Sequence, residues 1–126
     1  MVKIAIIEDD QLISQMYRLK FTESGFAVDV AADGKTGVEM IAATQPDLVL
    51  LDLWMPEMDG ITALKLIRKL PGGDKLPVVI LTNSGGPEDE MLLRDMGVDD
   101  YIVKADFTPR EVVAKIQTIL DKHGLK

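Results

Sequence analysis

The sequence predicts an α/β fold in which a five-stranded parallel sheet carries helices on both faces. Five short apolar runs alternate with five amphipathic segments along the 126 residues, and glycine or proline stands at many of the junctions. The run Leu48–Leu51 has no polar residue, which is typical of a central strand covered on both faces. Strands that alternate with helices are joined by right-handed crossovers, so the sheet is predicted to be parallel.

The first part of the chain predicts a strand followed by a helix. Val2–Ile7 is apolar and β-branched except for Lys3, and it ends on three acidic residues. A helix is predicted from Asp10 to Ser24, and Gly25 stands where a helix ends in a left-handed cap. The apolar residues at helical spacing, expected to form its core face, are Leu12, Ile13, Met16 and Leu19.

The next two strands and helices have clear boundaries. Phe26–Ala31 predicts a strand, and the following short helix carries Val38, Ile41 and Ala42 before Pro46 stops it. The central strand ends at Asp52. The helix after it repeats apolar residues on one face and stops at a loop signal, Pro71-Gly72-Gly73. The residues of that face are Ile61, Leu64, Ile67 and Leu70.

The last third of the chain predicts two more strands and two more helices. Val78–Leu81 is a strand that ends on Thr82, and residues 83–86 predict a loop. A helix begins at Pro87 and ends at Gly97. Strand Tyr101–Val103 is followed by Lys104. The final helix opens with Thr108-Pro109-Arg110-Glu111, a capping box with proline at the first helical position. Its predicted core residues are Val112, Val113, Ile116, Ile119 and Leu120.

Composition restricts the function. A formal net charge of −7 argues against direct nucleic-acid binding, which needs a basic face. No apolar run is long enough to cross a bilayer, no signal peptide is apparent, and no cysteine is present. We therefore expect one cytoplasmic domain over residues 1–126.

Five polar residues follow the predicted strands. Because parallel strands end at one edge of the sheet, these side chains should meet there. They are Glu8, Asp9, Asp52, Thr82 and Lys104. Taken singly, each has an ordinary structural interpretation: Asp52 can cap the following turn, the acids can open a helix, and Lys104 can be a solvated surface lysine. Together, three carboxylates need a hard cation, for which Mg²⁺ is best suited. A hydroxyl and an ammonium beside them point to phosphoryl transfer onto Asp52.

Four segments resemble the signature motifs of response-regulator receiver domains of two-component signalling, the family that includes chemotaxis regulators. These segments are Ile6–Asp10, Leu50–Gly60, Val79–Thr82 and Asp100–Lys104. The resemblance implies a flavodoxin-like fold with strand order 2-1-3-4-5. It also implies an aspartyl-phosphate formed at Asp52 from a phosphohistidine donor. Mg²⁺ would be held by Glu8 or Asp9, Asp52 and the backbone carbonyl of Trp54.

The resemblance further implies a switch and a set of partners. Thr82 and Tyr101 match the family's switch pair, although Tyr101 is equally well explained as a half-buried strand aromatic. The face formed by the helix from Pro87, strand five and the helix from Thr108 would bind a downstream protein. The donor would be a histidine kinase or a histidine phosphotransfer protein. The chain would act as a phosphoacceptor and not as an enzyme with its own substrate, as a monomer or a phosphorylation-dependent dimer.

Three residues depart from the family pattern: Asn83 replaces a small residue, Ala105 replaces a proline, and Glu8 replaces a frequent aspartate. Without proline a cis bond costs about 2.5 to 4 kcal/mol, so we predict a trans Lys104–Ala105 peptide with the ammonium still reaching Asp52. Trp54 should shield the phosphoryl group and Ser84 is a poor base, so self-dephosphorylation should be slow.

Three other functions on the same fold are less consistent with these residues. A flavin or nucleotide site needs phosphate-binding backbone donors after strand one, where this chain has Glu8-Asp9-Asp10. An aspartate-nucleophile hydrolase needs an acid two residues after the nucleophile, and Trp54 stands there. A docking module that has lost phosphorylation would not need the complete acid set.

Overall fold

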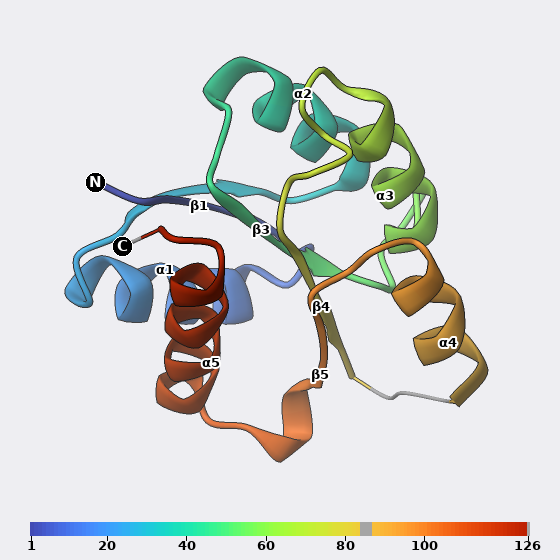
Figure 1. Ribbon diagram of the computed structural model, residues 1–126. Helices are drawn as coiled ribbons and strands as arrows, with labels where there is room; N and C mark the ends of the chain where they lie inside the picture. Colours follow the sequence, from blue (N-terminus) through green and yellow to red (C-terminus); the bar gives the residue numbers. More distant parts are fainter. Residues whose placement is uncertain (84–86, 126) are drawn as a thin grey trace.

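The computed structural model describes residues 1–83 and 87–125, which form a parallel sheet between two layers of helices (Figure 1). The strands are β1 (Lys3–Ile7), β2 (Ala27–Ala31), β3 (Leu48–Asp52), β4 (Val78–Thr82) and β5 (Asp100–Val103). The helices are α1 (Gln11–Glu23), α2 (Gly34–Thr44), α3 (Gly60–Lys69), α4 (Pro87–Asp95) and α5 (Pro109–Lys122), with a 3₁₀ turn η1 (Lys104–Asp106) before α5. The strand order is β2-β1-β3-β4-β5. The predicted fold class and strand order are confirmed.

Each face of the sheet has its own hydrophobic core. Helices α1 and α5 cover one face, and α2, α3 and α4 cover the other (Figure 1). Every residue of β3 and of β4 is buried, because their side chains point alternately into the two cores. The predicted core residues of the last helix, from Val112 to Leu120, are all buried.

Helix α1 buries a different face from the predicted one. Leu12 is 86% exposed and Leu19 58% exposed, Met16 is also exposed, and only Ile13 is partly buried. The buried residues are Ser14, Tyr17 and Phe21. Both sets have helical spacing, and the face with two aromatic rings buries more apolar area. The ring of Phe21 lies 5.7 Å from that of Phe26, which anchors this face.

Local signals place the helix boundaries as predicted. Asp10, Asp33, Asp59 and Thr108 cap the amino ends of α1, α2, α3 and α5. The predicted capping box is present, with Thr108 and Glu111 bonded reciprocally. After α4 the chain turns at Gly97, which has a φ of 81°. Residues 84–86 of the predicted loop after Thr82, including Ser84, lie outside the described residues.

Arg68 of α3 holds two loops at the amino end of the sheet. Its guanidinium donates to the carbonyl oxygens of Gly73 and Leu76 in the α3–β4 loop, at 2.8 and 2.7 Å. It also donates to the carbonyls of Met96 and Gly97 after α4, at 3.2 and 2.9 Å. One side chain of α3 therefore fixes the ends of two loops. Among the described residues, no helix is long and apolar enough to span a membrane.

Candidate functional site

The carboxyl ends of the strands bring the predicted residues together. In the register of the sheet, Ile7 of β1 pairs with Leu51 of β3, so Glu8 follows β1 beside Asp52. Asp52 in turn pairs with Leu81 of β4, next to Thr82, and Thr82 pairs with Val103, next to Lys104. Residues far apart in the sequence therefore share one edge of the sheet, as predicted.

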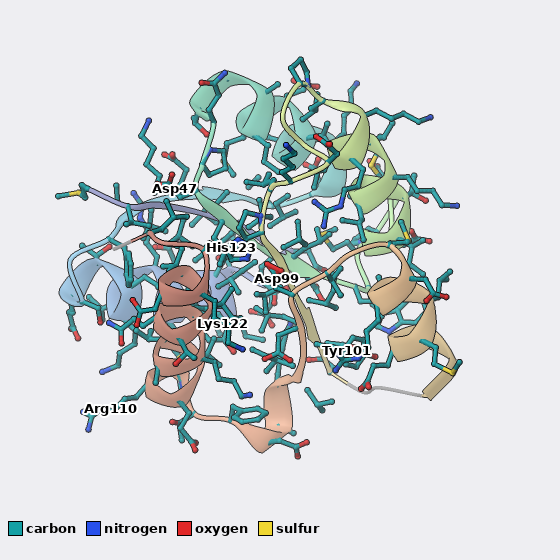
Figure 2. The ribbon with its side chains drawn as sticks, in the orientation of Figure 1. Asp47, Asp99, Tyr101, Arg110, Lys122 and His123 are labelled. Atoms are coloured by element: carbon teal, nitrogen blue, oxygen red, sulfur yellow. The ribbon has the colours of Figure 1, made fainter. Side chains whose placement is uncertain are left out.

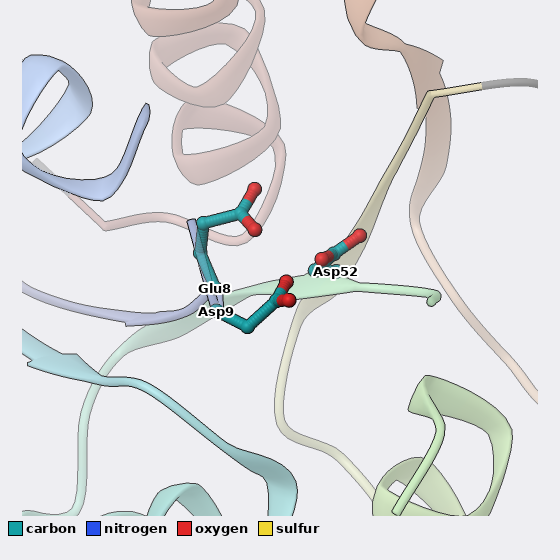
Figure 3. Close-up of side chains that lie close together, drawn as sticks. All are labelled: Glu8, Asp9 and Asp52. Carbon is teal, nitrogen blue, oxygen red and sulfur yellow. The ribbon is translucent and has the colours of Figure 1, made fainter. Parts of the chain in front are cut away.

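Glu8, Asp9 and Asp52 form a carboxylate cluster in which ligand atoms lie within 4.8 Å of one another. Figure 3 shows Glu8 and Asp9 at the end of β1, with their carboxylates turned toward Asp52 on β3. Glu8 and Asp52 are buried, whereas Asp9 is exposed. The third acid of the segment, Asp10, accepts the amide N–H groups of Leu12 and Ile13. Asp10 therefore caps α1, whereas Glu8 and Asp9 belong to the carboxylate cluster.

Asp52 has a strongly shifted acidity. Burial, followed by its hydrogen bond to Glu8 and the negative charge of Glu8, raises the pKa of Asp52 to about 8, while the Lys104 ammonium acts in the opposite direction. The repulsion among carboxylates expected from the sequence is therefore present. A divalent cation here would favour the carboxylate form of Asp52.

Lys104 contacts two acids of the cluster. Its Nζ forms an ion pair with Oε1 of Glu8 and lies 3.6 Å from Oδ1 of Asp52. Lys104 is the first residue of η1. Within residues 1–83 and 87–125 no peptide bond is cis. The predicted trans Lys104–Ala105 peptide is therefore confirmed, and the ammonium reaches Asp52 as expected.

Thr82 and Tyr101 lie on neighbouring strands. Thr82 is completely buried at the end of β4. Tyr101, in β5, pairs with Ile80 of β4 and packs beside the core beneath α2, α3 and α4, with its hydroxyl oxygen buried (Figure 2). The inward position of Tyr101 fits either of the two interpretations of this residue, and the switch pair stays a prediction.

The loop after Asp52 is closely packed against the strand. The amide N–H of Trp54 donates to Oδ1 of Asp52 at 3.4 Å, so Asp52 bonds to the following turn and also faces the acids. The indole of Trp54 is 54% exposed. Gly60 opens α3 so close to β3 that a Cβ atom would lie 2.5 Å from the carbonyl oxygen of Asp52. Only glycine fits at this position without moving the backbone.

Two features were not predicted from the sequence: the ion pair between Glu8 and Lys104, and the effect of Glu8 on the pKa of Tyr17. β1 and β5 are separated by two strands in the sheet, so no pairing pattern connects their ends. In the sequence, only the length of these two side chains suggested that they could reach each other. Tyr17 is buried in α1, and burial followed by the charge of Glu8 raises its pKa.

A cavity of about 370 Å³ lies away from the carboxylate cluster, where α2 and α3 end. Its lining is mainly apolar and includes Ile41, Pro46, Leu70 and Leu76. None of the lining residues is ionisable, so this cavity offers no acid, base or cation of its own.

The donor set of the cluster suits Mg²⁺. Three carboxylates supply oxygen ligands only, which a hard cation prefers, and the raised pKa of Asp52 reflects negative charge that a cation would offset. Lys104 adds a positive charge for an anionic oxygen, and Thr82 adds a hydroxyl donor.

Comparison with known proteins identifies the family. The model of the response regulator receiver domain matches residues 4–117. The response regulator MprA of Mycobacterium tuberculosis is 34% identical over 120 residues, which are 94% of this chain and 50% of that protein. MprA of Mycolicibacterium vanbaalenii is 32% identical over 119 residues, with the same coverage. The chain thus spans about half the length of the curated relatives it matches.

Solved structures agree with the sequence relatives. The Vibrio cholerae chemotaxis protein CheY4 superimposes with a TM-score of 0.90 at 27% identity, over 95% of this chain and 99% of that one. The receiver domain of the Francisella response regulator 1452 gives a TM-score of 0.87 at 31% identity, over 98% and 99%. The motifs, the strand order and these matches agree, and the chain belongs to the response regulator receiver domain family.

Proposed function

We propose that residues 1–126 act as a single cytoplasmic receiver domain that accepts a phosphoryl group on Asp52 from a phosphohistidine donor, in a reaction that requires Mg²⁺. The observation that carries this proposal is the position of Asp52 among Glu8, Asp9 and Lys104 at one edge of the sheet. The donor is a histidine kinase or a histidine phosphotransfer protein.

The residues have separate roles in the transfer. Mg²⁺ would be held by Glu8, Asp9, Asp52 and the backbone carbonyl of Trp54, and when bound it would offset the negative charge of the acids and of the phosphoryl oxygens. A carboxylate oxygen of Asp52 attacks phosphorus, the P–N bond to histidine breaks, and its electron pair stays on the imidazole nitrogen. Lys104 and the hydroxyl of Thr82 bind phosphoryl oxygens. The product is an acyl phosphate on Asp52 and a neutral histidine once that nitrogen takes a proton from water.

The phosphoryl group then changes the surface that partners bind. Thr82 moves toward the phosphoryl oxygen, and the ring of Tyr101 turns further into the space this leaves. The affected face consists of α4, β5 and α5, because Thr82, Tyr101 and Lys104 connect the site to these elements. A phosphoryl group shifts the equilibrium through these differential contacts. A downstream protein or a second copy of the chain binds the altered face.

Intact mass spectrometry with a small phosphodonor tests the transfer. With Mg²⁺ we expect a single added phosphoryl group, and with EDTA none, because the acids repel the donor unless a cation is present. Asp52→Ala should remain unmodified in both conditions, whereas Asp33→Ala, at an acid outside the cluster, should be modified like the wild type. Equal labelling of the Asp52→Ala variant would contradict the proposal.

A further inference from the structure

Both carboxylate oxygens of Glu8 already have a partner in the structure. Its side chain is only 1% exposed. Oε2 accepts the amide N–H of Asp10 at 3.1 Å, and Oε1 is paired with the ammonium of Lys104. The backbone of Glu8 is fixed as well, because its N–H donates to the carbonyl of Ala31 at 3.0 Å. Each oxygen keeps a further lone pair, but a cation that binds Oε1 would lie beside the ammonium already paired there, and the two positive charges would repel each other.

Lys104 is the partner that can leave. The amide of Asp10 belongs to the turn that starts α1, and moving it would disturb the helix cap. The ammonium of Lys104 stands on a flexible four-carbon stem and already lies 3.6 Å from Asp52. A small rotation of the stem transfers it from Glu8 toward Asp52.

We propose that Lys104 and Mg²⁺ compete for Oε1 of Glu8, so that metal binding releases the Lys104 ammonium toward Asp52, where the phosphoryl group arrives. This inference rests on the proposed function, because it uses the same metal site. It makes Glu8 a positioning residue for Lys104 as well as a ligand. Competition also couples two steps, because the ammonium becomes available to a phosphoryl oxygen when the metal enters.

The inference gives a reason for glutamate at this position. The additional methylene of Glu8, compared with the aspartate that many receiver domains carry, extends its carboxylate from the end of β1 toward Lys104 after β5. Lys104 then neutralises a nearly buried carboxylate that would otherwise be costly to bury. The consequence is a weaker affinity for Mg²⁺ than the three acids alone would have.

A double-mutant cycle on Mg²⁺ affinity tests the competition without any phosphodonor. Mg²⁺ is titrated into the wild type, Lys104→Met, Glu8→Gln and the double variant, and binding is followed by calorimetry and by the fluorescence of Trp54, the single tryptophan. Lys104→Met should tighten binding about tenfold in the wild-type background, the effect expected from removing one charge-assisted hydrogen bond. In the Glu8→Gln background the same substitution should change affinity by less than about twofold.

The control and the contrary outcomes are distinct. Lys115→Met removes a positive charge that pairs with Asp100 away from the cluster, and it should leave Mg²⁺ affinity unchanged. An equal gain from Lys104→Met in both backgrounds would show repulsion through space and overturn the competition, while Mg²⁺ binding itself would stand. No saturable Mg²⁺ binding by the wild type would overturn the competition and the metal part of the proposed function together.

The wild-type protein provides an independent readout. The NMR signals of the Lys104 ε-methylene group should shift on Mg²⁺ addition and reach saturation with the calorimetric isotherm, while those of Lys115 stay in place. A Lys104 signal that does not respond while Mg²⁺ binds would overturn the inference. This measurement does not depend on whether any variant folds.

Discussion

Asp52 links the charge of the site to the stability of the fold. Its pKa of about 8 in the folded protein lies far above the value of about 3.9 expected in an unfolded chain. Between these values the folded state holds the additional proton, so the free energy of unfolding decreases as the pH rises. Asp52→Asn removes the ionisation, and its stability advantage over the wild type should grow from about pH 5 to about pH 8 and then level off.

Urea unfolding in EDTA across this range measures the difference. Asp33→Asn is the matched control, because hydrogen bonds from the backbone N–H and the hydroxyl of Thr36 lower the pKa of Asp33. The stability that Asp33 contributes is lost only below its ordinary pKa, so its difference from the wild type should be constant between about pH 5 and about pH 8. A constant difference for Asp52→Asn would contradict the expected shift.

Trp54 is expected to slow the loss of the phosphoryl group. Replacing it with asparagine should speed self-dephosphorylation several-fold, because a small polar side chain admits and orients water where the indole excludes it. Since the indole is 54% exposed, the substitution should change stability by less than about 0.5 kcal/mol. The decay of intact phosphorylated mass measures the rate, and Leu66→Asn on α3 is the control. An unchanged decay rate would show that Trp54 does not slow self-dephosphorylation.

At the residue scale, the sequence predicted which side chains meet but not how they pair. Each member of the site ends a strand or lies within two residues of a strand end, so its position depended only on the strand ends. The ion pair of Glu8 with Lys104 depends on side-chain rotamers across four strands, which no local pattern encodes. For the three adjacent acids, the sequence predicted Glu8 and Asp9 in the site and Asp10 at the start of the helix, and the bonds of Asp10 to the first amides of α1 agree with that prediction.

At the scale of elements, α1 shows where periodicity fails. Two residue sets on this helix have the same spacing, and only the tertiary packing of Tyr17 and Phe21 decides between them. Strands β3 and β4 carry no such ambiguity, because a continuous apolar run is buried on both faces whatever its orientation. The order of the strands came from the resemblance to receiver domains, since the alternation of strands and helices alone is compatible with several orders.

Substitutions on α1 test the corrected face. Phe21→Ala should destabilise the protein by about 3 to 5 kcal/mol, because it empties a buried site. Leu12→Gln on the exposed face should change stability by less than about 0.5 kcal/mol. The midpoint of urea unfolding measures both. If Leu12→Gln cost as much as Phe21→Ala, the face originally predicted from the spacing would be the buried one.

At the scale of the whole molecule, the phosphoryl signal should spread to the β5 edge of the sheet, on both of its faces. Amide hydrogen exchange after addition of Mg²⁺ and beryllofluoride, a phosphoryl mimic, should change in α4, β5 and α5. These elements lie next to Thr82, Tyr101 and Lys104, whereas α2 follows β2 at the opposite edge of the sheet. Asp52→Ala treated in the same way is the control. Changes confined to α1 would show that the partner face is not the one formed by α4, β5 and α5.

The carboxyl end of α5 is held against the start of β5. His123, which follows α5, lies 3.1 Å from the carboxylate of Asp99, just before β5 (Figure 2). Lys115 of α5 also pairs with Asp100 and stacks on the ring of Phe107, 4.8 Å from its centre. These contacts join the start of β5 to α5, so we expect a displacement of β5 to move α5 as well.

The contacts of Arg68 restrict which residues can replace it in this fold. Its three guanidinium nitrogens reach four carbonyl oxygens on two loops, and the planar group spreads its donors over directions that one point charge does not cover. Lysine has three donors on one nitrogen and would leave at least one of these carbonyls to water. Position 68 is thus a place where exchanging one basic residue for the other is not conservative, although nothing in the charge of the protein would change.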